Sequence, residues 1–166
     1  MDLGQINPLL LLASLMVAAT PILLAAIGEA VVEKSGVLNL GVEGMMITGA
    51  VVGFAIGVNT GAPAIGFVAA ACAGAALSML FGVLVLYLKS NQVATGLGLT
   101  LFGLGLSALI GKPYEGIKAP TMAKWDIPLL SDIPVLGPIM FRHDPMVYVS
   151  IIIVALTWYV LARTRA

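Results

Sequence analysis

Apolar residues dominate four long stretches that hold no charged side chain: residues 3–28, 44–88, 90–111 and 145–162. A transmembrane helix needs about 20 mostly apolar residues, so the longest stretch predicts two crossings and each of the others predicts one. The pattern therefore predicts an all-α fold, a polytopic transmembrane helix bundle with five spans.

Turn-forming and polar residues set the predicted limits of these spans. Residues 1–166 read as a single transmembrane domain, with a loop outside the membrane core at about 112–144 and a turn at 59–63. Pro21 is expected to kink the first span, and a run of glycines is expected to break the second helix in its first part. The predicted spans are Pro8–Gly28, Val37–Val58, Ala64–Leu88, Val93–Gly111 and Met146–Ala162.

Composition agrees with a membrane protein and removes several kinds of function. Hydrophobic residues make up 60% of the chain and charged residues 10%, and the mean hydropathy is +1.09, which leaves too little polar surface for a soluble domain. A net charge of zero gives no reason to expect nucleic-acid binding. The sequence shows no pair of carboxylates and no nucleophile with a base, so we expect no enzyme activity and no catalytic residue.

Two reactive side chains occur once each. Cys72 lies within the third predicted span, where a free cysteine usually serves as a small apolar filler. His143 lies beside Asp144 just before the fifth span, and we interpret it as a polar residue at the membrane interface. Neither has the convergent partners that a metal site needs, so no metal and no cofactor are expected in this chain.

Basic residues near the ends of spans predict the orientation, because they are retained on the cytoplasmic side. One side of the membrane receives Lys34, Lys89, Arg163 and Arg165, and the other receives Lys112, Lys118, Lys124 and Arg142. The count is equal, but the first group lies in short connections or at a span end, where the rule is strongest. This favours a cytoplasmic location for the first group and an amino terminus outside.

The segment from Gly36 to Ala50 places Asn39 and Glu43 among four glycines. Glycine weakens a helix, and a carboxylate at membrane depth is energetically expensive. Such a segment is expected as broken helix that lines a cavity or a protein interface, where its polar groups find partners.

A second polar group lies where the chain re-enters the membrane after the third span. Asn91, Gln92 and Thr95 can hydrogen-bond a polar solute, or they can satisfy backbone groups near the start of a helix. Capping is the simpler of the two interpretations.

Small residues recur at every fourth position in three spans, which lets helix backbones approach closely. Such ridges predict a compact bundle, although any protein with several spans needs them, and a specific dimer contact is the alternative. The helix-packing positions are Gly49, Gly53 and Gly57 in the second span, Gly66, Gly74 and Gly82 in the third, and Gly103, Ser107 and Gly111 in the fourth.

The outer loop contains a near-repeat, residues 126–130 and 132–136, in which an aspartate precedes an Ile-Pro pair. Its prolines forbid a long helix, while the interleaved aliphatic residues suggest segments that lie on the bundle or at the interface. The loop is either a plain connector or a docking surface.

Three stretches together carry a family resemblance: residues 29–46 (EAVVEKSGVLNLGVEGMM), 91–97 (NQVATGL) and 133–138 (IPVLGP). In these stretches the chain resembles permease subunits of bacterial ABC importers of the branched-chain amino acid and simple-sugar type. The resemblance is closest to the nucleoside and simple-sugar permeases, and the three stretches occur in the order that the family shows.

The resemblance implies a transport subunit that forms half of a translocation path for a small polar solute, a nucleoside or a simple sugar. The implied partners are a second permease subunit, a pair of cytoplasmic ATPase subunits that carry ATP and Mg, and an external substrate-binding protein. The implied location is the bacterial inner membrane. Asn39, Glu43, Asn91, Gln92 and Thr95 are expected to approach the path, or Glu43 instead locks helices together by hydrogen bonds.

One departure from the family concerns length. The cytoplasmic helix that docks on the ATPase follows the fifth span in the family, and permeases are about twice as long, so we expect this chain to be an amino-terminal portion. Two other interpretations remain: half of an ion-coupled secondary transporter or a small channel, which would also use broken helices, and a purely structural membrane subunit.

Overall fold

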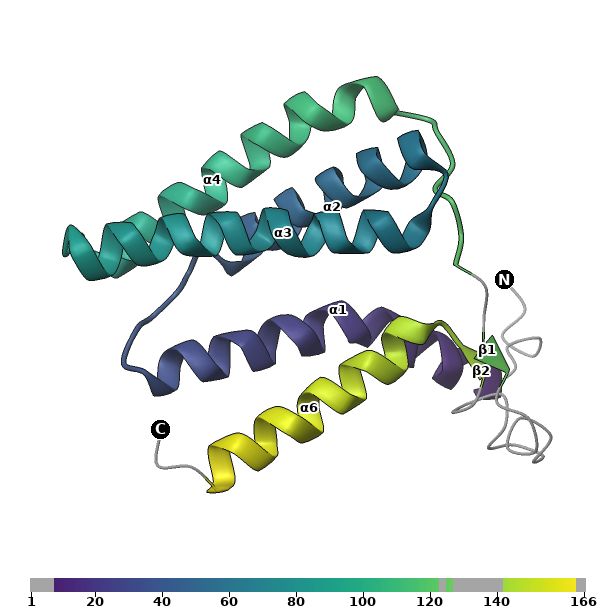
Figure 1. Ribbon diagram of the computed structural model, residues 1–166, viewed down its shortest axis with the longest axis horizontal. Helices are drawn as coiled ribbons and strands as arrows, with labels where there is room; N and C mark the ends of the chain where they lie inside the picture. Colours follow the sequence, from purple (N-terminus) through teal and green to yellow (C-terminus); the bar gives the residue numbers. More distant parts are fainter. Residues whose placement is uncertain (1–7, 123–124, 127–141, 164–166) are drawn as a thin grey trace. The chain divides into compact units, whose positions relative to one another are not determined.

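The computed structural model describes residues 8–122, 125–126 and 142–163 (Figure 1). Within them, five helices are long and apolar enough to cross a membrane. The structure thus confirms the all-α fold and the five predicted spans. Apart from Asp126, the near-repeat of the outer loop lies outside the described residues, as does the family stretch at 133–138.

The helices and strands have the following bounds: α1 Pro8–Lys34, α2 Val42–Thr60, α3 Pro63–Gly82, α4 Gln92–Gly111 and α6 Pro145–Arg163. A π-helical turn, Val83–Tyr87, continues α3, and a 3₁₀ turn, Lys112–Tyr114, continues α4. Two short strands, β1 Trp125–Asp126 and β2 Arg142–His143, pair antiparallel with Trp125 opposite His143.

The first helix is longer than predicted, because it ends at Lys34 and not at Gly28. Residues 29–34 contain no glycine or proline, so nothing in the local backbone stops the helix there. It ends before Gly36, which has a φ of +84° that other residues rarely adopt. Pro21 lies inside this continuous helix.

The second helix begins at Val42, five residues later than predicted. Residues 37–41 are not helical, so the expected break is a non-helical lead-in segment followed by a helix of 19 residues. The change of conformation places Asn39 in this lead-in segment and Glu43 in the first turn of α2.

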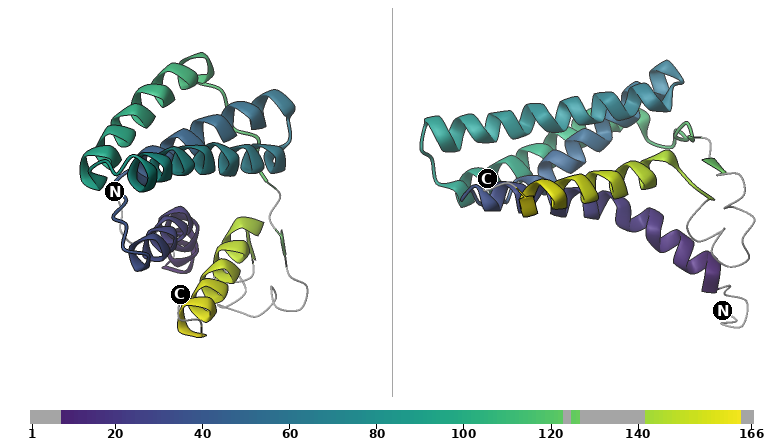
Figure 2. Two further views of the ribbon diagram at one scale, coloured as in Figure 1. Left: turned by 60° about the vertical axis from the view of Figure 1, so that its left-hand side comes forward. Right: turned by 60° about the horizontal axis from the view of Figure 1, so that its bottom comes forward.

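Residues 32–122 form one compact unit that contains α2, α3 and α4. In this unit α2 packs against both other helices, whereas α3 and α4 have few contacts with each other (Figures 1 and 2). Close pairs such as Gly49 with Ala70 and Gly57 with Gly66 show that α2 and α3 run antiparallel. The pairs Gly44 with Gly103 and Val51 with Gly111 show that α2 and α4 run parallel.

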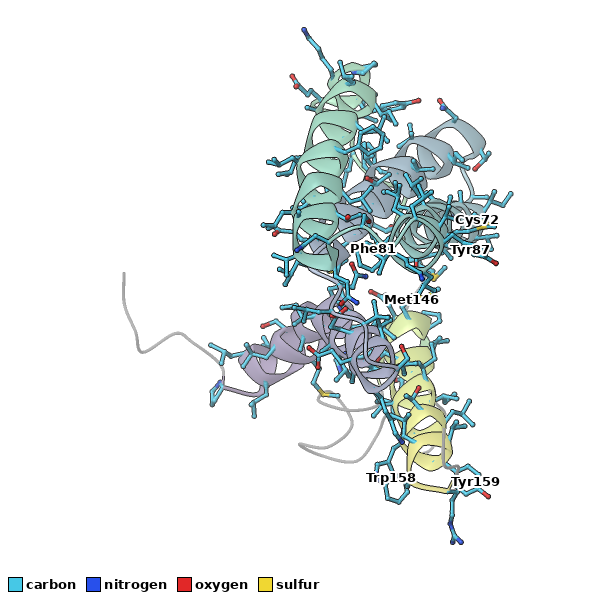
Figure 3. The ribbon with its side chains drawn as sticks, turned by 90° about the vertical axis from the view of Figure 1, so that its left-hand side faces the viewer. Cys72, Phe81, Tyr87, Met146, Trp158 and Tyr159 are labelled. Carbon is cyan, nitrogen blue, oxygen red and sulfur yellow. The ribbon has the colours of Figure 1, made fainter. Side chains whose placement is uncertain are left out.

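A small apolar core lies in this unit. It is formed by Met45, Leu77, Phe81, Val85 and Leu99, with Val37 of the lead-in segment packed against it. Figure 3 shows Phe81 directed inward, where only 4% of its surface is exposed.

Cys72 was expected to be a buried filler, but it is exposed on α3 (Figure 3). Its helix packs on α2 through Gly66 and Ala70, and Cys72 lies away from that contact. The interpretation of Cys72 as a packed filler is therefore wrong within the described residues.

The other compact unit contains α1 as far as Val31, the two short strands and α6. His143 lies just before α6, where its side chain is 3% exposed and its backbone N–H donates to the Tyr148 hydroxyl at 3.3 Å. Trp158 and Tyr159 project from the last turns of α6, at 71% and 58% exposure (Figure 3). Exposed aromatic residues near a helix end, followed by Arg163, are typical of a membrane–water boundary.

Candidate functional site: a helix that begins inside the bundle

The lead-in segment, residues 37–41, runs along the first turns of α4 and is hydrogen-bonded to it. The backbone N–H of Leu38 donates to Gln92 Oε1 at 2.8 Å, and the Thr100 hydroxyl donates to the carbonyl oxygen of Leu40 at 3.0 Å. Non-helical backbone within a membrane protein requires such internal partners, because lipid supplies none. Two family-like stretches that are about 50 residues apart in sequence therefore meet in space.

Asn39 holds the lead-in segment in its turn. Its Oδ1 accepts the backbone N–H of Gly41 at 2.9 Å, and its Nδ2 lies 3.7 Å from the sulfur of Met45. The residue is 6% exposed. Asn39 thus has a positioning role in the folded chain, as short polar side chains commonly do in turns.

Glycines allow the lead-in segment and α2 to lie directly on α4. A Cβ added at Gly96 would be 2.9 Å from the backbone N of Leu40, and one at Gly44 would be 2.5 Å from the carbonyl oxygen of Leu99. One at Gly103 would be 2.5 Å from the carbonyl oxygen of Gly44. Real Cβ atoms do not approach so closely, so this crossing requires glycine.

The polar residues at the start of α4 also bond within the chain. Asn91 Oδ1 accepts the backbone N–H of Ala94 at 3.0 Å and caps the helix. The hydroxyls of Thr95 and Ser90 lie 2.8 Å apart. Capping therefore explains the role of Asn91, and Gln92 accepts a hydrogen bond from the lead-in segment.

The first turn of α2 lies beside the middle of α3 and the middle of α4. A Cβ at Gly74 would be 3.9 Å from the carbonyl oxygen of Met45, and Gly74 is in the middle of the span Pro63–Tyr87. Gly103, which touches Gly44, is in the middle of the span Gln92–Tyr114. Helix α2 therefore begins beside the middle of α3 and α4, and the N–H groups of its first turn lie at that level.

Glu43 is the one predicted path residue with an exposed, unengaged side chain. It lies in the first turn of α2, and it makes no hydrogen bond or ion pair with the residues that the structure describes. A negative charge is favourable at a helix N-terminus. The hypothesis that Glu43 locks helices together finds no partner in the described part of the chain.

A third face of α2 is left between the faces that contact α3 and α4. From Glu43 it continues at helical spacing through Met46, Ala50 and Phe54, and we call these four residues the open face of α2. Glu43, Met46 and Ala50 are exposed. Since a carboxylate is costly against lipid, the open face must adjoin protein or water at the depth of Glu43.

The predicted helix-packing glycines differ in what they contact. A Cβ at Gly53 would be 2.8 Å from the Ala70 Cβ, and one at Gly66 would be 2.6 Å from the carbonyl oxygen of Gly53, which places both at the crossing of α2 and α3. Gly49 and Gly57 lie at the same crossing. Gly82 departs from the expected row, because a Cβ there would meet no described atom within 4 Å.

A pocket of about 240 Å³ occupies the far end of the open face. Phe54, one of its lining residues, meets the ring of Tyr114 edge-on at 6.1 Å, and the Tyr114 hydroxyl accepts a hydrogen bond from Asn59 Nδ2 at 2.8 Å. Its lining is formed by Ala50, Gly53, Phe54, Gly57, Pro63, Gly66, Phe67, Ala70, Ala119 and Pro120.

Sequence reasoning missed both the open face and the pocket. The helical spacing of residues 43, 46, 50 and 54 was visible in the sequence, but which side of α2 stays uncovered depends on where α3 and α4 pack. It also missed the buried Thr48 hydroxyl, which has no hydrogen-bond partner in the described residues. No group of three His, Cys, Asp or Glu residues that could hold a metal occurs in the described ranges.

Comparison with known proteins places this architecture in a family. The family described as "Branched-chain amino acid transport system / permease component" matches residues 11–166. No solved structure matches the chain.

Three curated relatives align with most of the chain. A Haloferax volcanii protein named "Putative glucose ABC transporter permease protein" is 37% identical, over 93% of this chain and 48% of its own length. A guanosine ABC transporter permease of Bacillus subtilis is 35% identical, over 99% of this chain and 55% of its own length. A nucleoside ABC transporter permease of Lactococcus lactis is 28% identical, over 94% of this chain and 53% of its own length. The chain spans about half the length of these relatives.

Proposed function

Because this chain belongs to the family of branched-chain amino acid transport system permease components, we propose that it serves as the membrane permease of an ABC importer. It is a multi-pass membrane chain, and its role is transport and not catalysis. The solute is a sugar or a nucleoside, which is what the names of the aligned relatives specify for those proteins.

The observation that supports a path through this part of the protein is the position of Glu43. Its carboxylate is exposed at the start of α2, and this helix begins beside the middle of α3 and α4. A carboxylate there can accept hydrogen bonds from the hydroxyl groups of a sugar, which both proposed solutes contain.

The other four predicted path residues influence the path by holding the backbone in position. Asn39 and Gln92 hold the lead-in segment, and Asn91 caps α4. Thr95 bonds Ser90 at the turn before α4. We assign them a positioning role: they fix the place at which α2 begins and thereby the place of Glu43.

The energy for transport comes from other subunits. A pair of cytoplasmic ATPase subunits binds ATP and Mg, a second permease completes the path, and an external binding protein delivers the solute. The membrane is the cell inner membrane, with the amino terminus outside and with Lys34 and Lys89 on the cytoplasmic side. The family match favours this importer over the ion-coupled transporter or channel.

The test compares Glu43→Gln and Glu43→Ala in the complete transporter. We expect Glu43→Ala to lower the uptake of labelled solute about tenfold, the effect of losing roughly 1.4 kcal/mol of solute hydrogen bonding. Glu43→Gln keeps an acceptor oxygen and is expected to retain more uptake. The matched control is Glu115→Ala, an exposed glutamate outside the helices.

Assembly of the complex is measured separately by co-purification of the subunits. Wild-type uptake in both Glu43 variants would refute a role in transport for this residue. Equal loss of uptake and of assembly would instead show that Glu43 is a structural residue.

A further inference from the structure

The open face of α2 joins two different surfaces. Glu43 lies at one end, and the pocket around Phe54 lies at the other. Ala50 lies seven positions after Glu43, which is about 10 Å along a helix. The Glu43 carboxylate and the pocket therefore lie at different heights along the same face of α2, within the unit formed by residues 32–122.

The shape of the pocket is set by the size of its side chains. Its floor consists of glycines and alanines, because α2 and α3 cross at Gly53 and Gly66 with almost no side chain between them. Two phenylalanine side chains, Phe54 and Phe67, stand beside this floor. A lining of small residues together with aromatic rings suits a flat ring better than a branched chain, because rings stack offset face to face or edge to face.

We propose that this pocket receives the flat, apolar face of the solute's ring on its way to Glu43, so that Phe67 is a solute-contacting residue. The proposal rests on the proposed transport function. Nucleosides present a base for stacking and sugars present an apolar C–H face, and aromatic side chains bind both through the same apolar and π contacts.

Phe67 is the informative residue because its ring has no other described role. It is 45% exposed, whereas the ring of Phe54 also packs against Tyr114. Losing the stacking of a base on an aromatic ring weakens binding by roughly fivefold to a hundredfold.

The experiment measures the uptake of a labelled nucleoside and of labelled glucose by cells that express the complete transporter with Phe67→Leu or Phe67→Trp. We expect Phe67→Leu to lower uptake of the transported solute about tenfold, and Phe67→Trp to preserve it. ATP hydrolysis by the assembled complex is expected to stay at the wild-type level in both variants. A structural defect would lower hydrolysis and uptake together and would overturn the proposal.

A lipid acyl chain is the competing occupant. Brominated lipid quenches tryptophan fluorescence on contact, so Phe67→Trp is compared with the wild type in vesicles that contain it. Strong quenching together with wild-type uptake in Phe67→Leu would overturn the proposal and assign the pocket to lipid. If the wild-type transporter carries neither solute in an ATP-dependent manner, the proposed function itself fails, which is a distinct result.

Discussion

A single methyl group decides how closely α2 and α4 can approach. We predict that Gly103→Ala destabilises the protein by about 1–3 kcal/mol, because its Cβ would overlap the backbone of Gly44. The measurement is the thermal unfolding midpoint of the purified protein in detergent.

Gly105→Ala supplies the matched control, two residues further along the same helix. A Cβ there would meet no described atom within 4 Å, so its midpoint is expected to equal or exceed that of the wild type. Equal destabilisation by both substitutions would contradict the described crossing of α2 and α4.

Residue types in the sequence indicated the polar positions but only partly their contacts. The capping of α4 by Asn91 followed from its place before an apolar run. The bond from Gln92 to Leu38 joins residues 54 apart, and no local pattern specifies such a pair. The same holds for Gly82, whose spacing matched the ridge while the facing helix does not reach it.

At the scale of the element, the end of α3 has an uncommon backbone. After the π-helical turn, Leu88 N–H donates to the carbonyl oxygen of Val83 at 3.2 Å, and Ser90 N–H to that of Leu84 at 3.1 Å. Between them Lys89 has a φ of +52°. This is the helix-ending position at which glycine is strongly preferred.

We predict that Lys89→Gly stabilises the protein by roughly 0.5–1 kcal/mol, because glycine adopts this conformation without the steric cost borne by other residues. The measurement is again the unfolding midpoint in detergent. Lys112→Gly is the comparison, since Lys112 has an ordinary helical φ of −51°, and it is expected to be neutral or destabilising. A lower midpoint for Lys89→Gly would contradict the left-handed conformation.

The five spans could be predicted because long uncharged apolar stretches permit little else in a membrane. The exact first and last residues of these spans were harder to predict from the sequence. Helix α1 runs on to Lys34 because helix formation does not stop where the apolar stretch stops. Helix α2 starts late because Asn39 and the glycines around it favour a turn, and where a turn gives way to helix depends on tertiary bonds such as that of Thr100 to Leu40.

For the whole molecule, we infer that the open face of α2 lies along a water-filled solute path. The surfaces of α3 and α4 that point outward instead carry large apolar side chains, such as Met79 at 73% exposure and Leu101 at 70%. These suit contact with lipid. The path and the lipid-facing surface should therefore differ in their access to water.

Cysteine labelling tests this difference most directly. In the complete transporter with Cys72→Ser as background, Met46→Cys on the open face is compared with Leu101→Cys on α4, using a hydrophilic maleimide. We expect Met46→Cys to be labelled, saturating transported solute to slow this labelling, and Leu101→Cys to stay unlabelled. Labelling of Leu101→Cys at the same rate, or no labelling of Met46→Cys, would contradict the claim.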